Sequence, residues 1–205
     1  FNHLSGYAPD APFKTLLVSP NVVREGLTER IEREIGFKKA VKAAHISLKM
    51  NSLVDEQIID SLYRASNAGV TVDVLVRGMC SLRPGVPGLS ANIRVRSVLG
   101  RYLEHSRIFA FAGGGDPAVF IGSADMMHRN LDRRVEALVR LSQPDHIREM
   151  TALFELAMSD NASTWHLGSD GAWTRHQYGS DGELLIDVQD KTMQDVYAKR
   201  NSRTA

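Results

Sequence analysis

The stretch HISLKMNSLVDEQIIDSLYRASNAGVTVDVLVRG, residues 45–78, contains two apolar runs separated by a more polar segment. In the first run Ile46, Leu48 and Met50 alternate with polar residues, which is the pattern of a strand with one buried face. The second run repeats this alternation with valines at positions 72, 74 and 76. Each run therefore predicts a strand.

The segment between the two runs is expected to be a helix. Asn51 or Ser52 is the expected N-cap, Asp55 and Glu56 stand in the first turn, and Gly69 ends the helix. A strand, a helix and a second strand in this order predict two parallel strands covered by a helix.

The flanking sequence extends this pattern. Residues 13–20 read as a strand, and residues 22–43 as a helix, because Leu27, Ile31 and Ile35 recur at every fourth position. Closely spaced strands without room for helices follow, which favours mixed pairing, and then one more helix is expected. The strands are predicted at 92–99, 106–111, 118–123 and 134–141, and the helix at 145–159.

The last part of the chain predicts a hairpin over residues 164–176 and a polar helix over residues 185–200. Trp165 and Trp173 are expected to pin the hairpin to the body. The fold class is α/β, with a mixed, largely parallel sheet flanked by helices and a short C-terminal hairpin and helix. The expected domain division is 1–12 as the remnant of an upstream domain or linker, 13–160 as the main domain, and 161–205 as the hairpin and helix packed on it.

Composition excludes several classes of protein. The chain has 205 residues, of which 43% are hydrophobic and 24% charged, as in soluble globular proteins. Its net charge of +1 requires no acidic partner, so an anion site has to be local. The single cysteine excludes an intrachain disulfide and fits a reducing cytosol, and no apolar run is long enough to span a bilayer. Because the chain starts with Phe1, we expect it to be part of a longer protein.

Arg77 is the first candidate for an anion site. It ends a predicted strand and is followed by Gly78. Open parallel sheets bind ligands beyond the carboxyl ends of their strands, so this arginine is placed to meet one. The alternative is an arginine paired with a surface carboxylate.

The second candidate is the His105-x-Arg107 pair in RYLEHSRIFAF, residues 101–111. The stretch around the pair reads as a strand, so both side chains are expected to share a face with Leu103 and Phe109. An imidazole can attack phosphorus or protonate a leaving oxygen, and an arginine beside it can bind phosphate oxygens through two hydrogen bonds. The alternative is a core histidine next to an arginine whose head reaches water.

The third candidate is FIGSADMMHRNLDRRVE, residues 120–136. A strand ends at Gly122, where the absent side chain would let backbone amides and the Ser123 hydroxyl approach an anion. Asn130 follows, and Glu136 opens the next strand. The Glu136 carboxylate is expected to accept a hydrogen bond from the His105 ring and hold its tautomer. A polar turn with a solvated charged face is the alternative.

The order His-x-basic, Gly-Ser-Ala, Asn and then Glu at a strand start resembles one half-site of the phospholipase D superfamily. In that family two such halves meet across a pseudo-two-fold axis, and one histidine attacks phosphorus while the other protonates the leaving group. Two residues depart from the pattern, because Arg107 replaces the usual lysine and Asp125 the usual asparagine. These departures indicate a branch that handles a different phosphate.

Five motifs together resemble the C-terminal catalytic domain of the phospholipase-D-like polyphosphate kinases, from residue 1 to about residue 160. They are FNHLSGY at 1–7, SLKMNSLVD at 47–55, LVRGMCSLRPG at 75–85, NIRVRSVLGRYLEHSRIFAF at 92–111 and IGSADMMHRNLDRRVE at 121–136. The resemblance implies reversible transfer of the terminal phosphate of ATP to inorganic polyphosphate. It also implies a phosphohistidine in a His-x-Lys motif of the preceding domain, a motif that this sequence lacks.

The resemblance also implies roles for single residues. Arg77 and His105 would contact the nucleotide phosphates, His105 as the second catalytic histidine. Arg107, Ser123 and Asn130 would bind ATP or phosphate, and Glu136 would orient His105. Lys49 would line a polyphosphate path or be solvated. Magnesium is expected for ATP chemistry, with its ligands outside this chain.

The expected partners are ATP or ADP, polyphosphate, the preceding catalytic domain of the same polypeptide and further copies of the full-length enzyme, but no nucleic acid. The expected location is cytoplasmic, including the periphery of the inner membrane. The isolated chain is expected to be inactive. Two alternatives remain: a homodimeric single-motif phosphodiesterase or nuclease, and a non-catalytic polyphosphate-binding module.

Overall fold

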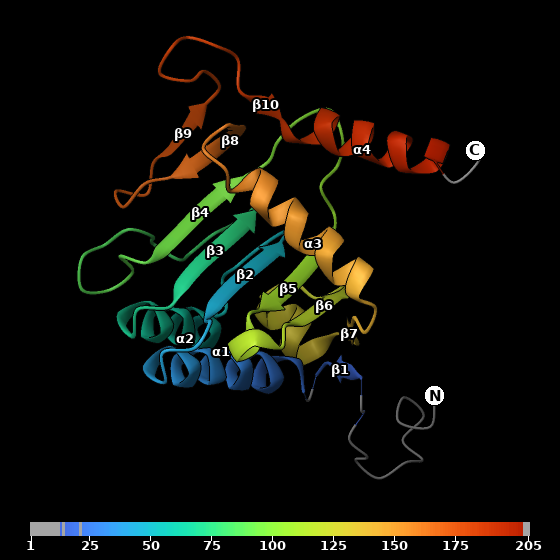
Figure 1. The fold of residues 1–205 in the computed structure, drawn as a ribbon. Coiled ribbons are helices and arrows are strands. Elements are labelled where there is room, and N and C mark those ends of the chain that lie inside the picture. The colour runs from blue at the N-terminus through green and yellow to red at the C-terminus, as the bar shows by residue number, and fades with distance from the viewer. Residues whose placement is uncertain (1–12, 14, 21, 203–205) are drawn as a thin grey trace.

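The computed structural model describes residues 13, 15–20 and 22–202. One mixed sheet carries helices on both faces (Figure 1), with strands in the order β1-β7-β6-β5-β2-β3-β4-β8-β10 and β9 paired to β8. The strands are β1 Leu16–Val18, β2 His45–Met50, β3 Thr71–Val76, β4 Ile93–Ser97, β5 Arg107–Phe111, β6 Ala118–Gly122, β7 Ala137–Arg140, β8 Ala162–Leu167, β9 Trp173–His176 and β10 Ile186–Asp187.

Helices α1 and α2 cover one face of the sheet, and α3 crosses the other face (Figure 1). The helices are α1 Val23–Lys39, α2 Glu56–Asn67, α3 Pro144–Ala157 and α4 Val188–Ser202, with the short turns η1 Gly113–Gly115 and η2 Arg129–Arg133. Among the described residues, no helix is both long enough and apolar enough to cross a membrane.

The strand–helix–strand unit of residues 45–78 is confirmed, because β2 and β3 pair in parallel and α2 lies between them in the chain. The expected cap is wrong. Asp55, and neither Asn51 nor Ser52, caps α2, since its Oδ1 accepts from the Ile58 amide at 3.1 Å. Its Oδ2 pairs with Arg24 of α1 at 2.9 Å, so the cap also ties the two helices together.

Helix α1 is confirmed with the predicted apolar face, and Leu27, Ile31 and Ile35 are buried. It ends at Lys39, about four residues before the predicted limit. The chain leaves the helical conformation there, as Val41 takes a φ of 55°.

The mixed sheet is confirmed, but parallel pairing is restricted to fewer neighbours than predicted. Among the described residues, three strand pairs are parallel, β2–β3, β3–β4 and β8–β10, and six are antiparallel. The connection from β5 to β6, residues 112–117, is too short for a crossover helix, so these two strands can pair only in antiparallel fashion. Strand β1 pairs with β7 in antiparallel fashion at the edge of the sheet.

The core lies in two layers. The first packs α1 and α2 against the sheet side formed by alternate residues of β2, β3 and β5, such as Leu48, Val74 and Phe109. The second packs α3 and the start of α4 against the opposite side, through Leu75, Ile108 and residues of the two helices. Both sides of the central strands are therefore buried, which makes the strand ends the accessible part of the sheet.

The C-terminal hairpin is confirmed as β8–β9, and α4 follows it. The parallel pairing of β10 with β8 has no counterpart in the prediction. Trp165 stands opposite Ser97 of β4 and is half-buried, whereas Trp173 is exposed, so its predicted anchoring role is wrong. Residues 161–202 join the same sheet through β4 and β8, while the predicted segment 1–12 lies outside the described residues.

Candidate functional site

The predicted site residues meet at one edge of the sheet. Because β2 and β3 are parallel, their carboxyl ends coincide, and β5 runs antiparallel to β2, so it begins at the same edge. This edge brings together Asn51 after β2, Arg77 after β3, and His105 with Arg107 at the start of β5. Residues far apart in the sequence therefore form one cationic corner.

Arg77 pairs with an amide and not with a carboxylate. Its Nε and Nη2 donate to the Asn51 Oδ1 at 3.0 and 2.5 Å. Its Nη1 is buried and has no hydrogen-bond partner in the part of the chain that the structure describes. The predicted alternative, pairing with a surface carboxylate, is therefore wrong. No carboxylate among the described residues compensates this guanidinium at the strand end, where an anionic ligand could do so.

Gly78 allows this arrangement. A Cβ at that position would lie 2.9 Å from the Asn51 carbonyl oxygen, closer than such atoms approach. The strand end of β3 thus packs directly on the turn after β2, and this contact places Asn51 beside the Arg77 guanidinium.

His105 does not lie in a strand. Strand β5 begins at Arg107, and residues 101–106 form an irregular segment in which Leu103 is 74% exposed. The expected strand face that would place His105 and Leu103 beside Phe109 is therefore absent. The His105 side chain is exposed, and its ring has no hydrogen bond to any described residue. The core-histidine alternative is wrong, and the ring is available to a ligand or another domain.

The Arg107 guanidinium turns inward. Its Nε and Nη2 bind the two carboxylate oxygens of Asp125 at 3.2 and 2.9 Å, and its Nη1 donates to the His105 carbonyl at 2.8 Å. Both side chains of this ion pair are nearly buried, 10% and 5% exposed. The two positions that depart from the superfamily pattern thus contact each other, and the two hydrogen bonds predicted for phosphate are made to Asp125.

Gly122 and Ser123 contribute to the pairing of β6 with β7. A Cβ on Gly122 would lie 2.1 Å from the Ala137 carbonyl oxygen, so the glycine is required for the close approach of β6 and β7. The Ser123 amide donates to that carbonyl at 3.2 Å, and its hydroxyl accepts from the Ala137 amide at 3.3 Å. The expectation that the Ser123 amide is open to an anion is therefore wrong, although the hydroxyl remains exposed and can still donate.

Glu136 contacts Asn130 and not His105. The Asn130 Nδ2 donates to the Glu136 Oε1 at 2.7 Å, and both side chains are buried. Among the hydrogen bonds of the described residues, none joins Glu136 to His105, so the expected orienting contact is absent. The pair instead closes the turn between β6 and β7, and the Asn130 Oδ1 has no partner among the described residues.

Lys49 is neither solvated nor an unpaired lining cation. Its Nζ donates to the Glu104 Oε2 at 2.8 Å and to the Ser106 Oγ at 2.7 Å, and the residue is 5% exposed. Glu104 compensates its charge, which leaves Arg77 as the stronger attractor of anions at this edge. Sequence reasoning gave no role in the site to Glu104 or to Asn51, which was expected only as a possible cap of α2.

The described residues contain no cluster of metal-ligating side chains. No group of three histidine, cysteine, aspartate or glutamate side chains among them could hold a metal ion. At the sheet edge, Asp125 and Glu136 already accept hydrogen bonds from Arg107 and Asn130.

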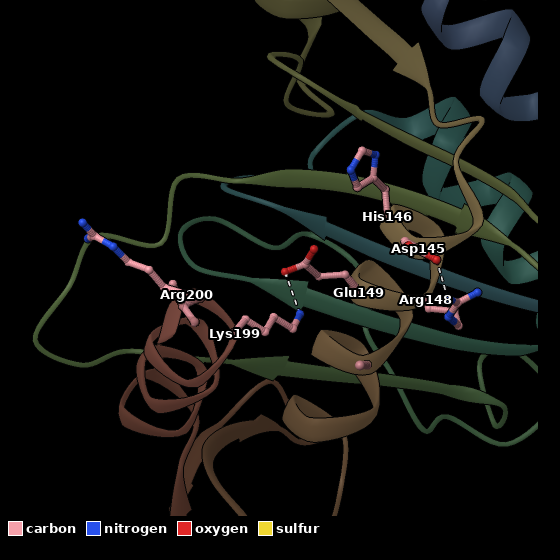
Figure 2. A pocket seen from close by; sticks show the side chains of 8 residues that line it. Asp145, His146, Arg148, Glu149, Lys199 and Arg200 are labelled. Atoms are coloured by element: carbon pink, nitrogen blue, oxygen red, sulfur yellow. Dashed lines mark hydrogen bonds and ion pairs between the residues drawn. The ribbon is translucent and has the colours of Figure 1, made fainter. Parts of the chain in front are cut away.

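A surface groove of about 890 Å³ lies between α3 and α4, away from the predicted site residues. Figure 2 shows Glu149 of α3 bound to Lys199 of α4 across it, at 3.1 Å, and Asp145 bound to Arg148 along α3. Its acidic and basic side chains largely pair with each other, so the groove offers no counterpart to the cationic corner.

Comparison with known proteins shows the family to which the chain belongs. The family model described as "Polyphosphate kinase C-terminal domain 2" matches residues 16–186. The chain is 55% identical over 204 residues to the polyphosphate kinase of Streptomyces coelicolor, covering all of this chain and 27% of that protein. It is 48% identical over 199 residues to that of Mycobacterium tuberculosis, covering 95% of this chain and 26% of that protein. The chain therefore spans about a quarter of the length of these relatives.

Solved structures give the same result. The crystal structure of polyphosphate kinase from Porphyromonas gingivalis matches with a TM-score of 0.89 and 38% identity, over 98% of this chain and 31% of that chain. Nuc from Salmonella typhimurium, a phospholipase D family member, matches with a TM-score of 0.51 and 14% identity, over 78% of this chain and 95% of that chain. The second likeness shows the phospholipase-D-like fold alone. The chain belongs to the polyphosphate kinase family, in which it corresponds to C-terminal domain 2.

Proposed function

We propose that the chain forms the C-terminal half of a polyphosphate kinase active site. The complete site would transfer the terminal phosphate of ATP reversibly to inorganic polyphosphate. The observation that carries this proposal is the cationic corner, where Arg77 has no carboxylate partner among the described residues and the exposed His105 ring lies at the same sheet edge. Family membership and this corner support the same chemistry.

The transfer would proceed in two displacements. A histidine of the preceding domain attacks the terminal phosphorus of ATP, the bond to the bridging oxygen breaks, and ADP leaves. The terminal oxygen of polyphosphate then attacks the phosphohistidine, and the histidine nitrogen is released. Both steps need charge neutralisation and positioning more than covalent help. An imidazole and an arginine whose charge is not compensated by a described carboxylate can supply both.

Arg77 would neutralise nucleotide phosphate oxygens, with Asn51 fixing its guanidinium. His105 would give a hydrogen bond or a proton to the leaving oxygen of ADP. In the reverse reaction it would take that proton back from the attacking oxygen. Arg107 would act indirectly, since its guanidinium is engaged by Asp125 and holds the His105 carbonyl. The Ser123 hydroxyl stays a phosphate-binding candidate. Asn130 and Glu136 would shape the neighbouring turn, and Asn130 keeps an acceptor without a partner among the described residues.

Further properties of the complete enzyme belong to the same proposal. Magnesium would accompany ATP with ligands outside the described residues, and the preceding domain of the same polypeptide would supply the nucleophilic histidine. Assembly into a homo-oligomer and a cytoplasmic location, including the periphery of the inner membrane, remain predictions.

The test compares variants of a full-length polyphosphate kinase that carries this domain. His105→Ala is expected to lower ATP-dependent polyphosphate synthesis by about 10²–10⁴-fold, the usual loss of a general acid. Arg77→Ala is expected to lower it through weaker nucleotide binding. His146→Ala, an exposed histidine on α3, is the matched control and should change little.

Two results would contradict the proposal. Full activity in His105→Ala would remove the histidine from the reaction. Robust polyphosphate synthesis by the isolated chain would show that it is not a half-site. Cleavage of plasmid DNA by a dimer of the isolated chain would favour the phosphodiesterase alternative. Polyphosphate binding that is weakened by Arg77→Ala, in a protein without catalytic activity, would favour the binding module.

A further inference from the structure

The segment between β4 and β5, residues 98–106, carries His105 without any regular structure of its own. Within the described part of the chain, no backbone–backbone hydrogen bond holds these residues. The side chain of Gln189, at the start of α4, does so instead. Its Oε1 accepts from the Tyr102 amide at 2.9 Å, and its Nε2 donates to the Tyr102 carbonyl at 2.8 Å. One side-chain amide thus replaces the two hydrogen bonds that a paired strand would supply.

The contacts continue from Gln189 to both sides of His105. The Gln189 Nε2 also donates to the Glu104 Oε1 at 2.9 Å, and Glu104 binds Lys49 of β2 through its other oxygen. Lys49 in turn donates to the Ser106 hydroxyl. The residues immediately before and after His105 are therefore both held by one chain of hydrogen bonds, which we call the Gln189 tether: Gln189, Glu104, Lys49 and Ser106.

The tether is built into the protein body. Gln189 is 6% exposed, and a Cβ on Gly100 would lie 2.5 Å from its Oε1, so the segment has a glycine where the amide lies. Val188, next to Gln189, is buried in the core layer of α3. The other end of α4 rests on α3 through Lys199 and Glu149 (Figure 2). In Figure 1 the segment between β4 and β5 passes beside the start of α4.

The tether also reaches Arg77, the residue that is proposed to bind nucleotide phosphates. Lys49, Glu104 and Arg77 line one small cavity of about 10 Å³, room for about one water molecule. A shift of the segment would thus change the position of His105 relative to Arg77. Catalytic groups that are displaced by about 1 Å can lose about 10²-fold in rate, because the reacting geometry is held only part of the time.

We propose that Gln189 is a positioning residue for the phosphoryl transfer, and that α4 serves to hold the His105 segment in its working position. This inference rests on the proposed function, since it gives His105 a role in the reaction. Gln189 itself touches no substrate in this scheme and acts only through the segment.

The experiment uses the full-length enzyme with Gln189→Leu, which keeps the size of the side chain and removes its hydrogen bonds. We expect kcat to fall about 10–100-fold, with a smaller change in KM for ATP, because Arg77 is left in place. Hydrogen exchange of residues 99–106 is expected to accelerate. Gln194→Leu, an exposed glutamine on the same helix, is the matched control and should alter neither quantity.

A second pair of variants separates positioning from general destabilisation. Gln189→Glu places a carboxylate against Glu104 and is expected to reduce kcat as strongly. Adding Glu104→Gln places an amide donor opposite that carboxylate. The double variant should therefore have a kcat at least tenfold higher than that of Gln189→Glu alone. A merely structural role would make activity follow the unfolding temperature in all variants, without this recovery.

The outcomes are distinct. If Gln189→Leu leaves kcat and the exchange of residues 99–106 at the level of Gln194→Leu, the inference is overturned. If Gln189→Leu does not fold, the Gln189→Glu variant with and without Glu104→Gln decides, and the absence of recovery overturns it. If His105→Ala is fully active, the proposed function fails by itself, whatever the exchange rates show about the tether.

Discussion

The ion pair between Arg107 and Asp125 allows a quantitative prediction about stability. Two hydrogen bonds, of 3.2 and 2.9 Å, join the two side chains, which are 10% and 5% exposed. Asp125→Asn keeps the shape of the side chain and leaves an oxygen to accept from the Asn51 and Ser52 amides, at 2.7 and 3.3 Å in the native protein. The substitution therefore removes mainly the negative charge.

The expected cost follows from the uncompensated guanidinium. Removing one partner of a buried ion pair costs about 3–5 kcal/mol, because the other charge remains out of water. For a domain of this size, each kcal/mol lowers the unfolding midpoint by about 2–4 °C. Asp125→Asn should thus lower the free energy of unfolding by about 3–5 kcal/mol and the midpoint by roughly 6–20 °C.

Chemical and thermal unfolding of the chain, followed by circular dichroism, measures both quantities. The control is Asp145→Asn, whose partner Arg148 is exposed, and we expect it to cost less than about 0.5 kcal/mol. A double-mutant cycle with Arg107→Met should give a coupling energy of about 1–3 kcal/mol. A loss no larger than that of the control, or a coupling energy near zero, would refute the reasoning.

Three further predictions concern packing, protonation and thiol chemistry. Gly122→Ala is expected to lower the unfolding free energy by about 2–3 kcal/mol, because the added Cβ meets a backbone oxygen. Gly36→Ala, on the open side of α1, should raise the unfolding free energy by about 0.5–1 kcal/mol. Equal effects of the two substitutions would contradict this prediction. Burial, with a smaller effect of Arg96, lowers the pKa of His166 from 6.5 to about 4. The unfolded chain then binds more protons between these pH values, so stability should fall as pH drops through this window, and His166→Gln should flatten the unfolding free energy there. Burial raises the pKa of the Cys80 thiol to about 11, so a thiol reagent at pH 8 should label the native chain far more slowly than the urea-unfolded chain, and equal rates would be inconsistent with a buried thiol.

The regular elements could be predicted because their signals are local. Four-residue spacing along Leu27, Ile31 and Ile35 and the alternation in β2 and β3 identify helices and strands without knowledge of the rest of the chain. Prediction was less accurate where a tertiary contact decides. Asp55 caps α2, and the same carboxylate binds Arg24 of α1, which lies 31 residues earlier in the sequence. Strand β10 has two residues, too few for a pattern.

The structure places the predicted site residues at one edge of the sheet, and their role in a site stays a prediction, but the pairings among them were not predicted. Arg107 and Asp125 were both recognisable as departures from a superfamily pattern, yet their contact requires the register of β5 against β6 and the turn that follows. Similarly, His105 was expected in a strand, because the apolar residues around it alternate. The segment leaves the sheet since the Gln189 amide, and not a neighbouring strand, takes its backbone groups.

The sequence by itself determined the elements, the family resemblance and the residue types of the site, because each depends on neighbours along the chain. Only the tertiary structure decided which charges are compensated. The partner of Arg107 lies 18 residues away and that of Lys49 lies 55 residues away, and no spacing rule connects them. Arg77 remains without a carboxylate at the strand end because none of the described acidic side chains folds onto it. That remaining charge, at the same sheet edge as an exposed histidine, is the physical basis of the proposed phosphate chemistry.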